Sequence, residues 1–175
     1  MASMTACTEC GFDYASISQA EVPEGIAAIG PMFARRVRGI DPELLRRRPK
    51  ASVWSPLEYA CHTRDVLLVQ RDRLYIALVE DTPTFAKMYR DERVSLARYN
   101  DQEPKEVADQ LEFAAALTAQ AFGALDFGHW LRPLIYNYPT PSQQTILFLG
   151  RHTIHEGRHH RADFDRSSSL GGPAS

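Results

Sequence analysis

The C-terminal part of this 175-residue chain concentrates side chains that bind metal ions. Four histidines, His152, His155, His159 and His160, lie within nine residues, and Glu156 stands among them. A neutral imidazole offers a nitrogen lone pair that suits zinc, nickel and similar divalent metals. Residues four apart on a helix project from the same face. The segment therefore predicts a metal-binding helix with two alternative pairs of ligands, His155 with His159 and Glu156 with His160.

The helical period separates the two pairs. At about 100° per residue, Arg151 and Arg158 fall on one side of the helix, which we expect to face water. The opposite side carries Glu156 and His160, whereas the other pair lies on the flank. A carboxylate that faces a protein core is costly unless it is paired or coordinates a metal. This cost favours Glu156 and His160 as ligands, and the competing pair remains an open alternative.

A third ligand is predicted earlier in the chain. His62 shares a helical stripe with Tyr59 and Val66, so its side chain should point inward. One ligand from this helix and the pair Glu156 and His160 from the later helix give three protein ligands. Three ligands leave a coordination position open for water or substrate, which is typical of a catalytic site. The alternative is that His62 is a core histidine held by hydrogen bonds, without a metal.

Two further residues are candidates for roles beside the metal. Arg73 lies about three turns after His62 on the same stripe, where it would either clamp a carboxylate or form a buried ion pair. Asp163 lies near the ligands on the later helix, together with His152, and either side chain could orient a ligand imidazole. We therefore name Arg73 and Asp163 as candidate catalytic residues.

The N-terminus suggests a second metal site. The stretch from Cys7 through Cys10 to Gly11 resembles half of a zinc knuckle, because two cysteines three apart can chelate one ion. The glycine permits the tight turn around that ion. His155 and His159, the pair on the flank, could supply the other half of a closed structural zinc site. The alternative is a redox-prone N-terminus that binds no metal.

The composition excludes several classes of protein. Apolar residues make up 44% of the chain and charged residues 24%, as in a soluble globular domain. The net charge is −2, whereas nucleic-acid and membrane-surface binders need a clearly basic face. No apolar run reaches the ~20 residues required to span a bilayer, and we find no secretory signal. We expect a cytoplasmic protein that binds neither nucleic acid nor membranes.

The spacing of apolar residues predicts an all-α fold, a four-helix bundle of residues 23–165. The clearest helix start is at Ser55, where a serine cap, a proline in the first turn and Glu58 form a capping box. Gly30-Pro31 should bend the first helix. The expected segments are an N-terminal extension over 1–22 that carries the cysteines, helices over 23–37, 55–79, 104–125 and 142–165, a long crossover over 81–101 between the second and third helices, a short extended piece at 130–136, and a disordered tail over 166–175.

Two motifs resemble those of a known family. The stretch from Trp54 to Asp65, WSPLEYACHTRD, is similar to the first ligand helix of the DinB-like superfamily. The stretch from Glu156 to Asp163, EGRHHRAD, is similar to its second ligand motif. The resemblance implies a four-helix bundle, often dimeric, in which three side chains hold a divalent metal. Carried over to this chain, the implied ligands are His62, Glu156 and His160.

The resemblance also implies a chemistry. Characterised members of the superfamily include thiol-dependent transferases and mycothiol-dependent maleylpyruvate isomerase. It implies that a low-molecular-weight thiol of the mycothiol type binds the metal, zinc in the first place and nickel in the second, and attacks a small electrophile. We therefore expect a homodimeric, metal-dependent thiol transferase or a related isomerase. The alternatives are a non-catalytic metal-binding or stress-related protein, a biosynthetic enzyme on the same scaffold, and a bundle with incidental histidines.

Overall fold

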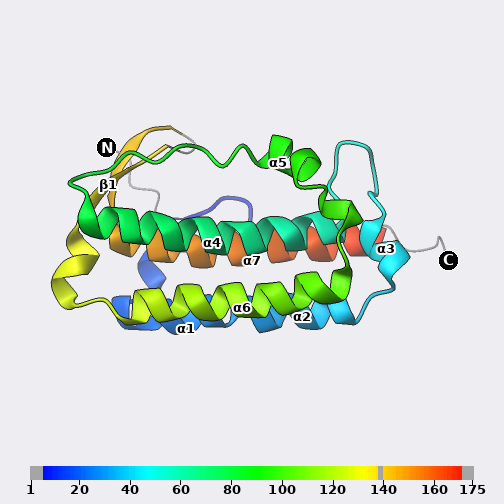
Figure 1. The fold of residues 1–175 in the computed structure, drawn as a ribbon, viewed down its shortest axis with the longest axis horizontal. Coiled ribbons are helices and arrows are strands. Elements are labelled where there is room, and N and C mark those ends of the chain that lie inside the picture. The colour runs from blue at the N-terminus through cyan, green and yellow to red at the C-terminus, as the bar shows by residue number, and fades with distance from the viewer. Residues whose placement is uncertain (1–5, 138–139, 171–175) are drawn as a thin grey trace.

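Four helical rods in two layers make up the body of the protein (Figure 1). The structure is a computed structural model that describes residues 6–137 and 140–170. In one layer α4 packs against α7, and in the other α6 packs against α1 and α2, which together form one interrupted rod. The predicted all-α four-helix bundle is confirmed. Its rods are α1 (Val22–Ala27), α2 (Ile29–Arg38), α4 (Pro56–Val79), α6 (Pro104–Gly123) and α7 (Ile146–Leu170).

Shorter elements connect these rods. Among them, strands β1 and β2 form an antiparallel hairpin, in which Pro133 lies opposite Thr145 and Tyr136 opposite Ser142. These elements are α3 (Pro42–Arg46), α5 (Arg90–Leu96), β1 (Pro133–Tyr136), β2 (Ser142–Thr145) and single turns of 3₁₀ helix at Tyr14–Ser16, Gln19–Glu21, Tyr99–Asp101 and Phe127–Leu131.

The connection between α4 and α6 sets the topology. It runs back along the bundle, so that α4 and α6 point in the same direction (Figure 1). The predicted long crossover is therefore confirmed. It also extends the hairpin, since the amide of Phe85 donates to the carbonyl of Ile135 at 3.1 Å and the amide of Ile135 donates to Pro83 at 2.8 Å. The crossover and the hairpin together cover one side of the α4–α7 layer.

Local signals explain where the long helices begin. At α4 the Ser55 hydroxyl accepts from the amide of Glu58, and the Glu58 carboxylate accepts from the amide of Ser55, as the capping box predicts. The first rod breaks at Ala28 rather than at the predicted Gly30-Pro31. Pro31 has no amide hydrogen to donate to the carbonyl of Ala27, so the hydrogen-bond ladder is interrupted four residues before the proline.

The start of the last helix was predicted wrongly. Residues 142–145 form β2 instead of the first turn of a helix, and α7 begins at Ile146. The backbone groups of these residues pair with β1, and that pairing is not visible in the local sequence. The extended piece predicted at 130–136 is present as its partner strand over 133–136.

Both ends of the predicted bundle also differ. The tail expected from residue 166 is helical through Leu170, because the buried Ser167 donates its hydroxyl to the carbonyl of Trp54 at 2.8 Å. The remainder of that tail, 171–175, lies outside the described residues. The N-terminal extension packs on the bundle, since Phe12 and Tyr14 are buried against α7. The Arg151 guanidinium donates to the carbonyl of Ile17 at 2.7 Å.

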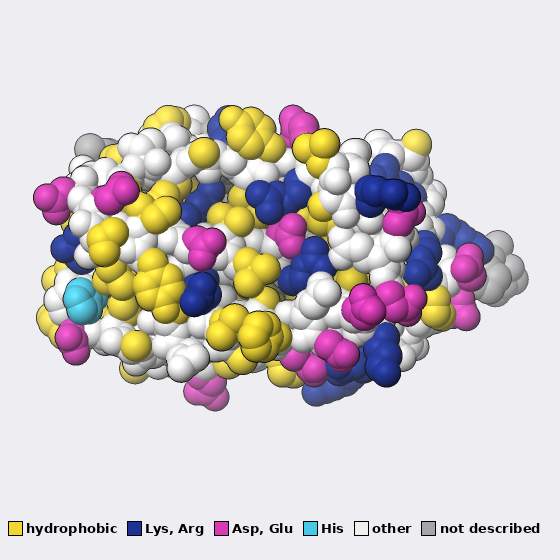
Figure 2. All heavy atoms as spheres, viewed as in Figure 1, with side chains coloured by type: hydrophobic (Ala, Val, Ile, Leu, Met, Phe, Trp, Pro, Cys, Tyr) yellow, Lys and Arg dark blue, Asp and Glu magenta, His cyan; other side chains and the backbone are white. Residues whose placement is uncertain are grey.

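Exposed apolar side chains gather over α4 and α6 on the face shown in Figure 2. The exposed apolar side chains of the two helices are Leu68, Tyr75, Ile76, Val79 and Phe113.

Within the described part of the chain, no helix combines the length and the apolar character needed to cross a membrane. The homodimer and the cytoplasmic location stay predictions.

A close approach of α2 and α6 fixes the lower layer. A Cβ atom on Gly30 would lie 2.6 Å from the carbonyl oxygen of Leu111 and 2.8 Å from the Cα of Glu112. Both obstacles belong to the backbone, which cannot rotate away as a side chain can. Glycine is therefore required at this crossing, although it weakens the interior of a helix.

We expect Gly30→Ala to lower the free energy of unfolding by about 1–3 kcal/mol, because the added methyl group forces the two helices apart. Chemical denaturation followed by circular dichroism measures this change. The matched control is Gly123→Ala. A Cβ atom there would lie 3.8 Å from its nearest neighbour, the Cβ atom of Pro23, which is an ordinary van der Waals contact. Equal stability of the two variants would contradict the close-packing argument.

Candidate metal centre

Three potential ligands converge between α4 and α7. His62 projects from α4, while Glu156 and His160 project from α7, and one ligand atom from each lies within 4.8 Å of the others. The rings of His62 and His160 meet edge to face with centroids 4.7 Å apart. The Nε2 atom of His160 lies 3.4 Å from Oε2 of Glu156. The structure therefore brings together the three residues that the sequence singles out as catalytic-metal ligands.

The hydrogen bonding of this group leaves room for an ion. His62 is 2% exposed, and its buried Nδ1 atom has no hydrogen-bond partner. A buried polar atom without a partner costs free energy, and a bound cation would remove that cost. The donor set of two imidazoles and one carboxylate matches the ligands that zinc accepts in catalytic sites. The residues present thus fit a divalent metal, and Nδ1 of His62 lacks the hydrogen bond that a purely structural histidine would need.

Asp163 orients one of the imidazoles. Its Oδ2 atom lies 3.1 Å from Nδ1 of His160, which leaves Nε2 of the same ring facing Glu156. Asp163 also pairs with Arg166. A carboxylate on the outer nitrogen of a histidine fixes the tautomer and the orientation of the ring, as is usual for metal ligands. This geometry fits the positioning role expected of Asp163.

Burial and charge set the protonation of the group. Burial lowers the pKa of His62 to about 3, with help from the neighbouring His160. Burial also lowers the pKa of His160, but hydrogen bonds to Asp163 and Glu156 outweigh it and raise that pKa to about 9. Burial raises the pKa of Glu156, yet its histidine neighbours hold that pKa well below the usual range. Glu156 is therefore an anion whose surroundings supply positive charge.

The group opens into a pocket of about 830 Å³ between the bundle and its covering segments. The walls come from α4, α7, the N-terminal segment, the crossover and the hairpin. They include His62, Arg73, Tyr136, His152, Glu156 and His160 from the helices and the hairpin, Cys7, Thr8 and Glu9 from the N-terminal segment, and Lys87, Tyr89 and Arg90 from the crossover.

Arg73 is a buried cation at this pocket. Its guanidinium donates to Gln70 at 3.2 Å, to the hydroxyl of Tyr136 at 3.1 Å and to the carbonyl of Ala86. Among the described residues no carboxylate forms an ion pair with it. In the described part of the chain Arg73 thus makes hydrogen bonds and lies over the rings of Phe85 and Tyr136 instead of forming the buried ion pair, and its role as a clamp for a carboxylate stays a prediction.

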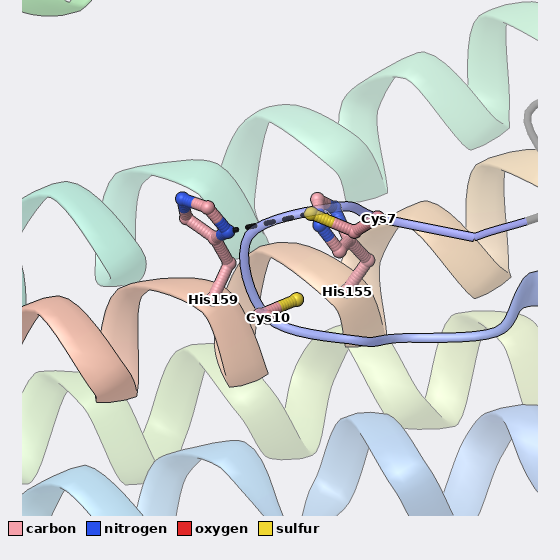
Figure 3. A group of neighbouring side chains, drawn as sticks. All are labelled: Cys7, Cys10, His155 and His159. Atoms are coloured by element: carbon pink, nitrogen blue, oxygen red, sulfur yellow. Dashed lines mark hydrogen bonds between the residues drawn. The ribbon is translucent and has the colours of Figure 1, made fainter.

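A second group of ligands lies beside the first (Figure 3). Cys7 and Cys10 come from the N-terminal segment and His155 and His159 from α7, and all four ligand atoms lie within 4.8 Å of one another. The sulfur of Cys7 is 3.8 Å from Nδ1 of His159. Burial raises the pKa of the Cys7 thiol, but backbone hydrogen bonds, chiefly at Cys10, lower it to about 6. His155 and His159 thus lie near the two cysteines and Glu156 and His160 near His62, while a third possible group, His152, His155 and Glu156, shares residues with both.

Sequence reasoning missed several aromatic residues of the site. The Tyr14 hydroxyl is 2.8 Å from Nδ1 of His152, and Tyr136 meets the ring of His152 edge to face at 4.9 Å. Trp54 meets His62 at 5.2 Å. Burial lowers the pKa of His152 to about 4. Tyr14 comes from the N-terminal segment and Tyr136 from the hairpin, and no periodic signal in the sequence points to them; Trp54 lies just before α4, at the start of the family motif.

Comparison with solved structures supports the fold. YfiT from Bacillus subtilis, described as a probable metal-dependent hydrolase with an unusual four-helix bundle topology, superposes with a TM-score of 0.73 at 15% identity, over 86% of this chain and 89% of that one. A mycothiol-dependent maleylpyruvate isomerase superposes with a TM-score of 0.69 at 13% identity, over 86% of this chain and 62% of the isomerase. No curated protein matches the sequence.

The sequence comparison assigns the family directly. The model of the DinB superfamily matches residues 29–164, which include the three converging ligands and the whole crossover. Both motifs that resemble this family lie on the two helices that form the centre. The chain belongs to the DinB superfamily.

Proposed function

We propose that His62, Glu156 and His160 bind one divalent metal ion, zinc in the first place, and that the protein is a metal-dependent enzyme acting on a small molecule. One observation carries this proposal: three convergent ligands, including the unpartnered Nδ1 of His62, line a pocket whose wall also contains the buried guanidinium of Arg73. A structural site would be closed by a fourth protein ligand, whereas this one faces the pocket.

The metal would supply one kind of chemistry, since a divalent cation lowers the pKa of a thiol or water bound to it. The residues of the chain would do the rest. Arg73 would hold a carboxylate of the substrate, because a guanidinium binds carboxylates through paired hydrogen bonds. Lys87 and Arg90 at the rim would attract the same anion. Asp163 would keep His160 in its ligating tautomer.

A low-molecular-weight thiol is our first choice of nucleophile, so the proposed activity is an S-transferase or a thiol-dependent isomerase. Three cations in the mixed-charge lining of the pocket, Arg73, Lys87 and Arg90, support an acceptor that carries a carboxylate, although Glu9, Asp91 and Glu92 line the same pocket. The similarity to the mycothiol-dependent isomerase is consistent with it. Hydrolysis is the second candidate, and the similarity to YfiT over nearly its whole length supports that candidate.

The first prediction concerns metal content. We expect His62→Ala and His160→Ala each to lose one metal ion per chain relative to wild type, because two ligands hold an ion far more weakly than three. Elemental analysis of purified, tag-free protein measures the difference. His129→Ala is the matched control, since His129 belongs to none of the ligand groups. Wild-type metal content in both ligand variants would overturn the proposed centre.

The second prediction concerns Asp163. We expect Asp163→Asn to weaken metal binding about 10–100-fold, because His160 loses the carboxylate that fixes its tautomer. Competition with a chromophoric chelator measures this affinity, in a Cys7→Ser background that disables the second group of ligands. Asp165→Asn is the control, since that exposed carboxylate pairs with Arg36 instead. An unchanged affinity in Asp163→Asn would contradict the positioning role.

The third prediction concerns turnover. The zinc-loaded protein should consume a low-molecular-weight thiol when offered a small electrophile that carries a carboxylate, and Arg73→Lys should raise KM more than it lowers kcat. Lysine keeps the charge but loses the paired hydrogen bonds. Arg71→Lys is the control, because Arg71 stacks on Tyr75 instead of lining the pocket. Hydrolysis without thiol would favour the second candidate, and no turnover of either kind would favour a non-catalytic metal-binding protein.

A further inference from the structure

We infer that Cys7, Cys10, His155 and His159 bind a second metal ion, a structural zinc that fastens the N-terminal segment to α7 beside the pocket. The four side chains come from two segments that are 145 or more positions apart, yet their ligand atoms lie within 4.8 Å of one another (Figure 3). Two thiolates and two imidazoles make up a common closed set of ligands for zinc. This inference does not depend on the activity proposed for the first centre.

The spacing of the atoms suits a tetrahedral ion. In a tetrahedron with metal–sulfur bonds of about 2.3 Å and metal–nitrogen bonds of about 2.0 Å, sulfur and nitrogen ligands stand roughly 3.5 Å apart. The observed separation of the Cys7 sulfur and Nδ1 of His159 is 3.8 Å. The two atoms are within hydrogen-bonding distance for sulfur, and their separation is also close to that expected across a shared ion.

The outer nitrogen atoms of both histidines face carboxylates. Nε2 of His159 lies 3.4 Å from Glu9 and 3.6 Å from Asp163, while Nδ1 of the same ring faces Cys7. Nδ1 of His155 lies 3.4 Å from Glu156. Metal-bound histidines commonly donate their other nitrogen to a carboxylate, which strengthens the ligand. His159 therefore shows this arrangement, whereas Nδ1 of His155 is close to Glu156 without a hydrogen bond of good geometry.

His155 gives an independent indication. It is 9% exposed, and neither of its ring nitrogens has a hydrogen-bond partner of good geometry. The rings of Phe12 and Tyr14 enclose it, with centroids 5.5 and 5.4 Å away. A buried imidazole that lacks partners on both nitrogens is costly. An ion at the centre of the group would satisfy the nitrogen that does not face Glu156.

The backbone of the N-terminal segment forms a closed turn that places Cys7 and Cys10 near α7. The amide of Gly11 donates to the carbonyl of Cys7 at 2.9 Å, and the amide of Cys7 donates to Phe12 at 2.8 Å. Gly11 has φ of +70°, a left-handed conformation that glycine adopts without strain. This closed turn holds both sulfur atoms on the side that faces α7 (Figure 3).

The consequence for the protein is a fixed pocket wall. Cys7, Thr8 and Glu9 line the pocket of the first centre, so an ion bound here would hold that wall in place. Two carboxylates link the two groups of ligands. Glu156 contacts His155 and His160, and Asp163 contacts His159 and His160. The third cysteine takes no part, since Cys61 is buried elsewhere and donates its thiol to the carbonyl of Tyr99.

The test uses cobalt and zinc on the full chain. We expect Cys7→Ser and Cys10→Ser each to lose one metal ion per chain together with the thiolate-to-cobalt charge-transfer absorption. His62→Ala should lose the other ion and keep that absorption, which separates failure of this inference from failure of the proposed function. Cys61→Ser, the matched control, should keep both ions. X-ray absorption of zinc-loaded His62→Ala should give two sulfur ligands at about 2.3 Å and two nitrogen ligands at about 2.0 Å.

Proteolysis tests the fastening itself. Removing zinc from wild type should speed chymotrypsin cleavage at Phe12 and Tyr14 by about tenfold or more, because local opening then no longer requires release of the ion. Cys10→Ser should be cleaved equally fast with and without zinc. The inference is overturned if the cobalt protein shows no thiolate absorption, if that absorption survives in both cysteine variants, or if Cys7 and Cys10 are found as a disulfide in protein that binds no thiolate-coordinated metal.

Discussion

A carboxylate among histidines is the constraint around which the site of this protein is organised. Glu156 lies on the inner side of α7, where its oxygens are 3.5 Å from His152, 3.4 Å from His155 and 3.4 Å from His160. An anion in such a place needs positive charge nearby. Protonated histidines can supply it, and so can a divalent cation. The contact of α4 with α7 brings His62, a buried imidazole, next to this carboxylate and so assembles the three candidate metal ligands.

Three segments outside the four rods turn this contact into a pocket. The crossover, the hairpin and the N-terminal segment each contribute to its walls, and each is tied to a neighbour by backbone or aromatic contacts. The parallel direction of α4 and α6 is what makes the crossover long enough to pass over the site (Figure 1). The topology of the bundle thus supplies the cover, while the two packed helices supply the ligands.

Family and fold do not settle the reaction of this chain. Proteins that share a bundle can use one metal for different nucleophiles, and the two solved structures that resemble this one are described as a hydrolase and an isomerase. The proposed function makes the pocket wall the place where a substrate would be selected, and that wall includes Arg73 and Tyr136 together with crossover residues of both charges. The cysteine-containing segment lies before the part of the chain that the family model matches.

The sequence by itself determined the elements and the inward faces of the helices. Apolar periodicity and capping residues act within a few positions, so the start of α4 at Ser55 and the inward side of Glu156 and His160 follow from local rules. Only the tertiary structure decided which distant segments meet. It paired residues 142–145 with a strand, tied Ser167 to the backbone of Trp54, and set Cys7 against a histidine 152 positions later. Such contacts depend on hydrogen bonds and burial between remote parts of the chain, and these leave no period in the sequence.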